Sequence, residues 1–405
     1  MRCITWRLGI AALALLGATA SRVAAQEPTA DTREGLVVAQ QQEKAGQLRP
    51  YEPNRGEEWV DRLERALSGS AQHWHPYFHN AYAGGGFTLG AGYLAHVGSY
   101  DTIDFRGSYT LSGYALLESE FVAPRLFDRR ARLALLGGWR KATQVGFYGY
   151  GTSGTSDSDR TNYSFERPYG EAVLTLRPTR GIFLLEGGAN YSKWDQGSGE
   201  GNKPSVEEVY TPAQLPGLGQ AVTYLHLRGT GAIDWRTSEG YSRRGGFYGV
   251  TFNNFADGDD RYSFKRVDYE AIQHVPLGRD AWVLSLRGRV ETTSTGSGKQ
   301  VPFFMLPAIG GGSSLRGYSS WRFRDLNSLL LQAEWRVLVN SFFDMAVFYD
   351  AGKVEHRAKE LDLDGLKSDV GIGFRFHGPA ATPLRIELAK GNEGIALVFA
   401  ASASF

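Results

Sequence analysis

The second half of the chain alternates apolar and polar residues with a period of two, which is the pattern of β-strands. In SLLLQAEWRVLV, residues 328–339, the odd positions are apolar, and Gln332, Glu334 and Arg336 share the other face. The segments 345–352, 367–377 and 384–391 repeat this arrangement, with one mainly apolar face and a second face that carries most of the charged residues and glycines. A chain with this pattern is predicted to form a sheet that separates two different environments.

Connection lengths distinguish a soluble β-sandwich from a membrane barrel. Short connections such as 177–181 and 340–344 alternate with long ones, the last of which lies between 292 and 325. Outer-membrane barrels have tight periplasmic turns, long surface loops and an even number of strands whose apolar face meets lipid. We therefore predict an all-β fold, a transmembrane antiparallel β-barrel of about 16 strands, over residues 76–405. The four strands between 76 and 124 are the least defined, because YAGGGFTLGAGYLAHVGSY fits one long strand or a hairpin.

The N-terminal segment has the features of an export signal. Arg2 and Arg7 precede an apolar run that ends in small residues, so residues 1–25 are predicted to be a cleaved signal peptide. Residues 26–75 are polar and are predicted to form a periplasmic linker with a short amphipathic helix in EEWVDRLERAL. Cys3, the one cysteine, lies in the predicted signal peptide. The expected location is the cell outer membrane.

Several function classes lack support in the sequence. A net charge of +1 without a lysine-rich tract argues against nucleic acid as a partner. The motifs G-x-S-x-G, G-x-x-x-x-G-K-[ST] and H-E-x-x-H do not occur, so we predict no enzyme, no catalytic residue and no cofactor. The histidines of HWHPYFH, residues 73–79, lie among aromatic residues that are typical of a membrane-interface belt, so no metal site is predicted there. Expected partners are outer-membrane lipid and lipopolysaccharide.

One long connection has an unusual composition. GGGSSLRGYSSWRFRD, Gly310–Asp325, contains three consecutive glycines, three arginines and several aromatic residues, and Phe303 and Phe304 precede it. A loop this apolar is unfavourable in water, so we expect it to fold into the barrel, with the glycines permitting a sharp reversal.

The same region resembles a known family. LPAIGGGSSLRGYSSWRFRD, followed by QAEWR, FYDAG and the final hairpin, is similar to the C-terminal barrel of the BamA/TamA outer-membrane assembly superfamily, also called the bacterial surface antigen family. The resemblance implies that Arg316, which matches the arginine of the family's (V/I/L)RG(F/Y) motif with Gly317 and Tyr318, contacts acidic residues on the inner wall.

The resemblance also identifies the wall residues of this expected loop-to-wall lock. The implied partners of the arginine are Asp350, in the F-x-D-x-G motif that ends at Gly352, and Glu334 one strand earlier. Both carboxylates lie on the polar, lumen-facing register of the alternation, so the pattern of the strands agrees with the resemblance. Phe399 and Phe405 lie on one face of the last strand and resemble an insertion signal, which implies the barrel assembly machinery as a partner during insertion.

The family's assembly factors carry periplasmic POTRA domains before the barrel, and residues 26–75 do not fit one, so we expect a barrel without them. The resemblance implies a part in outer-membrane biogenesis or in translocation of polypeptide or lipid, through a weak seam between the first and last strands. The alternative is a passive diffusion pore or small-substrate channel. The sequence identifies neither the client nor a periplasmic or lipoprotein partner.

Overall fold

The computed structural model describes residues 58, 73–179, 181–378 and 381–400, and for residues 279 and 280 it describes the backbone only. The chain divides into two units, residues 1–53 and 54–405, and all described residues belong to the second. The predicted signal peptide, most of the predicted linker and helix, and Phe405 therefore lie outside the described residues.

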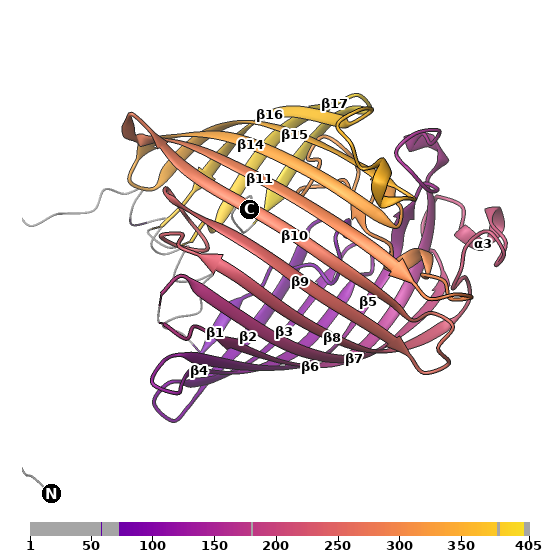
Figure 1. Cartoon of the computed structure of the whole chain (residues 1–405), viewed down its shortest axis with the longest axis horizontal. Helices are drawn as coiled ribbons and strands as arrows, with labels where there is room; N and C mark the ends of the chain where they lie inside the picture. The colour runs from indigo at the N-terminus through magenta and orange to yellow at the C-terminus, as the bar shows by residue number, and fades with distance from the viewer. Residues whose placement is uncertain (1–57, 59–72, 180, 379–380, 401–405) are drawn as a thin grey trace, which may run out of the picture. The chain divides into compact units, whose positions relative to one another are not determined.

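Within the described residues, sixteen strands form one antiparallel sheet in which each strand pairs with its neighbours along the chain (Figure 1). The strands are β1 (Trp74–Pro76), β2 (Thr88–Val97), β3 (Asp101–Thr110), β4 (Ala115–Leu126), β5 (Ala131–Phe147), β6 (Thr161–Leu176), β7 (Phe183–Ser198), β8 (Ala221–Asp234), β9 (Gly245–Asp257), β10 (Phe264–Leu277), β11 (Arg279–Thr295), β14 (Asn327–Asn340), β15 (Phe343–Glu355), β16 (Lys367–Phe376), β17 (Leu384–Gly391) and β18 (Gly394–Ala400). This confirms the predicted all-β antiparallel fold of about 16 strands. The ambiguous segment forms a loop followed by the single strand β2.

The remaining elements are short and lie in the connections. They are η1 (Asp157–Asp159), α3 (Val206–Val209), η2 (Phe303–Met305), η3 (Ala358–Glu360) and the two-stranded ladder of β12 (Ala308–Ile309) and β13 (Phe323–Arg324). Among the described residues, no helix is long and apolar enough to cross a membrane.

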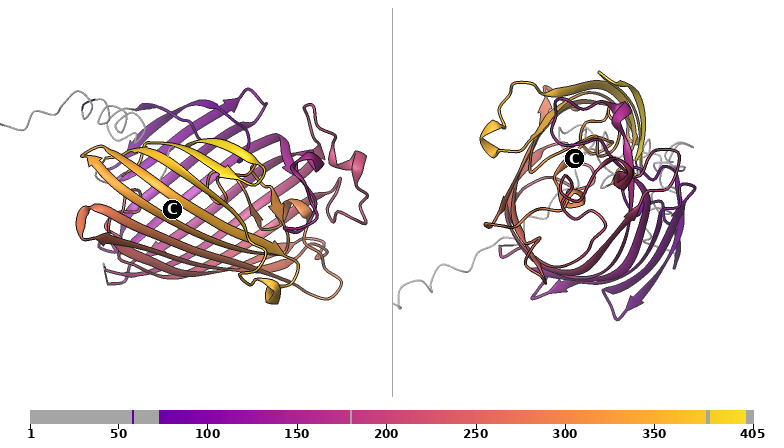
Figure 2. Two further views of the ribbon diagram at one scale, coloured as in Figure 1. Left: turned by 90° about the horizontal axis from the view of Figure 1, so that it is seen from above. Right: turned by 90° about the vertical axis from the view of Figure 1, so that its right-hand side faces the viewer.

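The strands carry their apolar side chains on the outside of the curved sheet. On β15, Met345, Val347 and Tyr349 are about half exposed, whereas Phe348 and Asp350 on the other face are buried. Successive side chains of a strand point to opposite faces of the sheet. When the charged residues of a strand face inward, its apolar residues therefore face outward. Figure 2 shows the sheet curving around an interior that loops occupy. A charged interior and an apolar exterior are the arrangement of a barrel surrounded by lipid.

The two ends of the sheet differ in the length of their connections. At the end that carries α3, the connections include 148–160, 199–220 and 296–326. At the opposite end most are tight, such as 127–130 and 341–342. The connection 235–244 is an exception, because it is long and lies at the short-turn end. By the usual habit of outer-membrane barrels, the short-turn end faces the periplasm.

The first and last strands are the edges of the sheet. β1 has three residues and pairs with β2, and β18 has seven and pairs with β17. No backbone ladder joins β18 to β1 within the described residues. The two edges are therefore the place where backbone pairing is least developed.

Two substitutions on β8 test the assignment of the faces. Leu227, near the middle of the strand, is 46% exposed on the outer face, whereas Thr230 faces inward beside Glu186 of β7. Leu227→Arg is expected to destabilise the protein by about 2–4 kcal/mol, because it places a cation in the apolar part of the bilayer. Thr230→Arg should lower the free energy of unfolding far less, because the new cation would lie in the lumen beside the carboxylate of Glu186. Urea unfolding in lipid vesicles measures both values, and equal losses would contradict the assignment.

Candidate functional site

The connection 296–326 folds into the interior of the sheet. Phe303 and Phe304 are buried with aromatic residues of β5, β6 and β7. Further along the loop, Tyr318 and Phe323 are buried in a second apolar cluster with wall residues. The members of that cluster are Ile309, Leu315, Tyr318, Phe323, Leu330 and Val354. The loop thus has an apolar core of its own, shared with the wall, and this core brings its arginines close to the strands.

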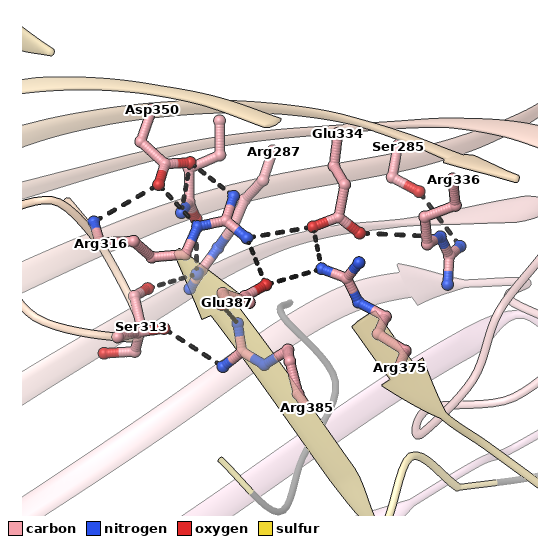
Figure 3. Close-up of polar contacts among 12 residues, drawn as sticks. Ser285, Arg287, Ser313, Arg316, Glu334, Arg336, Asp350, Arg375, Arg385 and Glu387 are labelled. Atoms are coloured by element: carbon pink, nitrogen blue, oxygen red, sulfur yellow. Dashed lines mark hydrogen bonds and ion pairs between the residues drawn. The ribbon is translucent and has the colours of Figure 1, made fainter. Parts of the chain in front are cut away.

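Arg316 of the loop forms ion pairs with three carboxylates, and its side chain is 1% exposed. Its Nε and Nη2 donate to the two carboxylate oxygens of Asp350 at 2.7 and 2.8 Å. Its Nη1 donates to Glu334 at 3.1 Å and to Glu387 at 2.9 Å. The Phe348 ring lies under the guanidinium, 3.4 Å from Cζ to the ring centroid. Figure 3 shows the guanidinium pointing between the three acidic side chains, which come from β14, β15 and β17.

Further arginines share the same carboxylates. Arg375 of β16 bonds both Glu334 and Glu387, and Arg385 of β17 donates to Glu387 at 2.7 Å. Arg385 also donates to the carbonyl oxygen of Gly312 in the loop at 3.2 Å. Charge-assisted bonds of this kind are shorter and stronger than those between neutral groups. The network therefore joins the loop to four neighbouring strands, β14 to β17.

The electrostatics of Arg316 follow from this arrangement. Burial by itself would lower the pKa of the guanidinium, since it removes the charge from water. The hydrogen bonds and charge of Asp350, together with the charges of Glu334 and Glu387, outweigh that effect and raise the pKa above its usual value. Arg316 therefore stays charged at any physiological pH, and the lock cannot be released by deprotonating it.

The other predicted members of the lock lie beside Arg316. Gly317 passes so close to the wall that an added Cβ would lie 2.6 Å from the backbone nitrogen of Gly391, which excludes any side chain. The Tyr318 hydroxyl donates to the carbonyl oxygen of Ser368 on β16 at 3.2 Å. Gly352 of β15 approaches the main chain of Leu329 on β14 in the same way. Phe399 lies apart from this site, 65% exposed on the outer face of β18.

The loop contacts both edges of the sheet. On the C-terminal side, Arg322 forms an ion pair with Glu393, in the turn between β17 and β18, at 2.6 Å. On the N-terminal side, the indole nitrogen of Trp321 donates to the carbonyl oxygen of Ala83 at 2.8 Å, and its ring stacks on Tyr82 at 4.5 Å. The loop thus bridges the two edges from inside, where the backbone ladder is absent among the described residues.

A second connection reaches the same wall from the short-turn end. The Tyr241 hydroxyl of the connection 235–244 donates to Asp344 at 2.8 Å, and its ring stacks on His377 at 3.8 Å. Arg336 donates to the Ser242 carbonyl oxygen and lies 3.7 Å from Glu334. The polar network therefore extends from the long loop through Glu334 to the opposite end of the interior.

Sequence reasoning did not identify all of these residues as part of the site. Glu387, Arg375 and Arg385 were visible as polar positions of their strands, but nothing in the local pattern connects them with Arg316. Tyr241 lies in a connection without any recognisable motif. The available signal was the alternation along β16 and β17, which places Arg375, Arg385 and Glu387 on the inward register.

The fold and the site together define an outer-membrane type of β-barrel with a loop anchored in its interior by arginine. An Omp85 superfamily domain matches residues 97–400, and the chain belongs to this superfamily. This confirms the resemblance to the BamA/TamA group. Members of the superfamily are transporters or assembly factors and not enzymes, and membership points to the outer membrane.

Two solved structures are similar to this chain. BamA from Haemophilus ducreyi, in a form lacking POTRA domains 1–3, has 15% sequence identity and a TM-score of 0.57, with 80% of this chain and 68% of that chain covered. CdiB from Acinetobacter baumannii has 12% identity and a TM-score of 0.51, with 77% of this chain and 56% of that chain covered. No curated protein matches the sequence. At these identities the similarity to solved structures shows the fold alone.

Removing Arg316 tests whether the loop depends on the buried network. Arg316→Ala leaves three carboxylates without their shared cation, and the free energy of unfolding should fall by about 3–5 kcal/mol. Asp350→Ala should also be costly, and the double variant should lose less than the sum of the two, because the residues are in direct contact. Unfolding in detergent micelles, with proteolysis near Tyr318, provides the measurement.

The matched control is Arg357→Ala on the exposed connection 356–366. Arg357 forms a surface ion pair with Glu360 at 3.5 Å, and both side chains are largely exposed. Its loss should lower the free energy of unfolding by about 0–1 kcal/mol. Strictly additive effects at Arg316 and Asp350, or a loss no larger than that of the control, would show that the network does not hold the loop.

Proposed function

We propose that this protein takes part in outer-membrane biogenesis or translocation, and that polypeptide or lipid passes at the seam between β1 and β18. The observation that carries the proposal is the loop 296–326, which occupies the interior and contacts both edges of the sheet. An occupied interior is unsuited to free diffusion, whereas two edges that no backbone ladder joins within the described residues offer a place for lateral passage. Members of the superfamily are transporters or assembly factors, and passage at the seam is compatible with either role.

The alternative, a passive diffusion pore, requires a water-filled channel along the interior. The aromatic cluster formed by the loop and the wall opposes it, because buried rings such as Phe147, Tyr163 and Phe303 fill space that a channel needs. The connection 235–244 adds a second obstruction at the short-turn end, through Tyr241. Two connections from opposite ends therefore reach into the same interior.

Electrical conductance separates these functions. In planar lipid bilayers, the protein should give small and fluctuating currents, because two loops occupy its interior. The second measurement is the outer-membrane protein and lipid content of a strain that lacks the gene, compared with the same strain carrying it. Large, steady currents together with an unchanged membrane composition would favour the diffusion pore and refute the proposal.

The two sides of the seam hold the loop unequally. On the C-terminal side the contacts are buried, charge-assisted bonds, each contributing about 1.5–3 kcal/mol. On the N-terminal side, the polar and aromatic contacts among the described residues are one hydrogen bond and one aromatic stack, each of about 0.5–1.5 kcal/mol, beside the apolar packing of Ala81 and Tyr82. An opening of the seam should therefore separate the loop from residues 82–84 and leave it attached to β14–β18.

Engineered disulfides test this direction of opening. A Cβ on Gly84 would lie 3.4 Å from Cβ of Ser320, and a Cβ on Gly312 would lie 3.9 Å from Cβ of Val398, close to the separation of about 3.5–4.5 Å found in disulfides. Gly84→Cys with Ser320→Cys joins the loop to the N-terminal side, and its oxidised form should fail to restore the deletion strain until reductant is added.

The control pair is Gly312→Cys with Val398→Cys, which joins the same loop to β18 and should restore function in both redox states. Each pair in its reduced form also controls for the effect of the substitutions themselves. Equal complementation by the two oxidised proteins would contradict a seam that opens on the N-terminal side.

A further inference from the structure

The turn between β4 and β5 carries an exposed group of arginines that the proposed function does not use. Arg125, Arg129, Arg130 and Arg132 lie within eight residues, and all four are exposed. The turn lies at the short-turn end of the sheet, opposite the end that carries α3 in Figure 1. We name these four arginines the arginine turn.

Of these four arginines, only Arg132 forms an ion pair with a carboxylate among the described residues. The side chains of Arg129 and Arg130 make no ion pair or hydrogen bond within the described part of the chain. The Arg125 guanidinium stacks over the ring of Tyr100 at 3.7 Å, and Arg132 lies 3.8 Å from Glu120, a long and partly exposed contact. The arginine turn therefore presents cations that are free to bind an anion.

The backbone of the turn is held in a conformation that side chains disfavour. Phe127, Asp128 and Arg129 have φ values of 49°, 57° and 66°. Glycine would adopt this left-handed region without steric cost, yet none of the three positions is glycine. The turn thus carries an aromatic ring and a cation at positions where glycine would be less strained. Backbone strain of this kind is concentrated at ligand-binding sites.

The arginine turn adjoins the apolar outer surface. Phe127 is 74% exposed at its tip, and Tyr100 beside Arg125 is 53% exposed. Phe105 and Leu135, on the outward faces of β3 and β5, are exposed as well. A ligand that binds both the arginines and the adjoining apolar surface must carry an anionic group next to a long apolar chain.

The charge of the connections differs between the two ends of the sheet. By sequence, the connections at the short-turn end contain seven arginines, no lysine and two acidic residues. Those at the other end, leaving out the internal loop 296–326, contain eleven acidic and five basic residues. Anions at the membrane surface are therefore attracted to the short-turn end and repelled from the other.

We propose that the arginine turn binds the phosphate headgroup of an anionic phospholipid in the leaflet that surrounds the short-turn end. The guanidinium groups of Arg129 and Arg130 match the geometry of phosphate oxygens, which accept paired hydrogen bonds from a planar fork. Phe127 and Tyr100 lie where the headgroup region meets the acyl chains, the position that aromatic residues favour in membranes. An acidic protein would satisfy the cations but leave the adjoining apolar surface without a partner.

Native mass spectrometry of the full-length protein with added phosphatidylglycerol or phosphatidylcholine tests the proposal. The protein should retain phosphatidylglycerol in preference to phosphatidylcholine. Arg129→Gln with Arg130→Gln should lower the retained phosphatidylglycerol by about fivefold for each arginine removed, and Arg129→Lys with Arg130→Lys should restore part of it. The control is Arg357→Gln with Lys359→Gln, which removes the same charge at the opposite end and should leave retention unchanged.

A second experiment does not require the arginine variants to fold. A photoreactive phenylalanine derivative at position 127 should form adducts with lipid when cells are irradiated. Protein adducts in place of lipid adducts would assign the surface to an acidic partner and overturn the proposal. Equal retention of the two lipids, or equal losses in the arginine variant and its control, would show that the binding is non-specific and would also overturn it.

Discussion

Among the described residues, the buried carboxylate of Asp350 forms its ion pair with a cation of the loop, Arg316, whereas Glu334 and Glu387 also bond arginines of the wall. Asp350, Glu334 and Glu387 come from three strands, are almost completely buried, and converge on Arg316 of the loop. Removing a charge from water costs several kcal/mol, so each group needs its partners in place. The wall therefore needs the loop at Asp350, and the loop needs all three carboxylates for Arg316. A buried network of this kind is weak evidence for high stability, but it fixes the position of the loop to within hydrogen-bonding distance.

The position of the loop determines what the rest of the interior can do. Arg316 and Arg322 hold the loop against β14–β18, and Arg324 donates to the hydroxyl of Tyr163 on β6 at 3.0 Å, so the loop crosses the interior between distant strands. Through Arg336, the same network reaches the connection 235–244 at the other end. The two ends of the interior are thus in physical contact through one chain of ionic and hydrogen bonds. Contact of this kind provides a physical route for coupling between the ends.

The sequence allowed the fold to be predicted more completely than the site. The alternation on β14 and β15 is a local property, and it correctly separated outward residues such as Trp335 and Tyr349 from inward ones such as Glu334 and Asp350. The site depends also on the stagger between strands, which sets how deep each inward residue lies. Parity places Glu387 on the inner face, but only the pairing of β16 with β17 brings it level with Arg316. Nothing in the local sequence indicates that Tyr241 points into the interior, because its partners Asp344 and His377 lie more than a hundred residues away along the chain.

Arginine serves two opposite purposes in this protein, and the environment decides between them. Inside the sheet, Arg316 is removed from water and surrounded by carboxylates, so its charge is fully used and no external ligand can compete for it. At the short-turn end, Arg129 and Arg130 are exposed and have no carboxylate partner in the part of the chain that the structure describes, so their charge is available to a ligand. The planar fork of the guanidinium suits both cases, since it binds carboxylate and phosphate in the same paired geometry. The opposite end of the sheet is acidic, and phosphate groups would be repelled there unless cations intervened. The distribution of charge therefore favours one orientation, with the short turns in the leaflet that contains phospholipid.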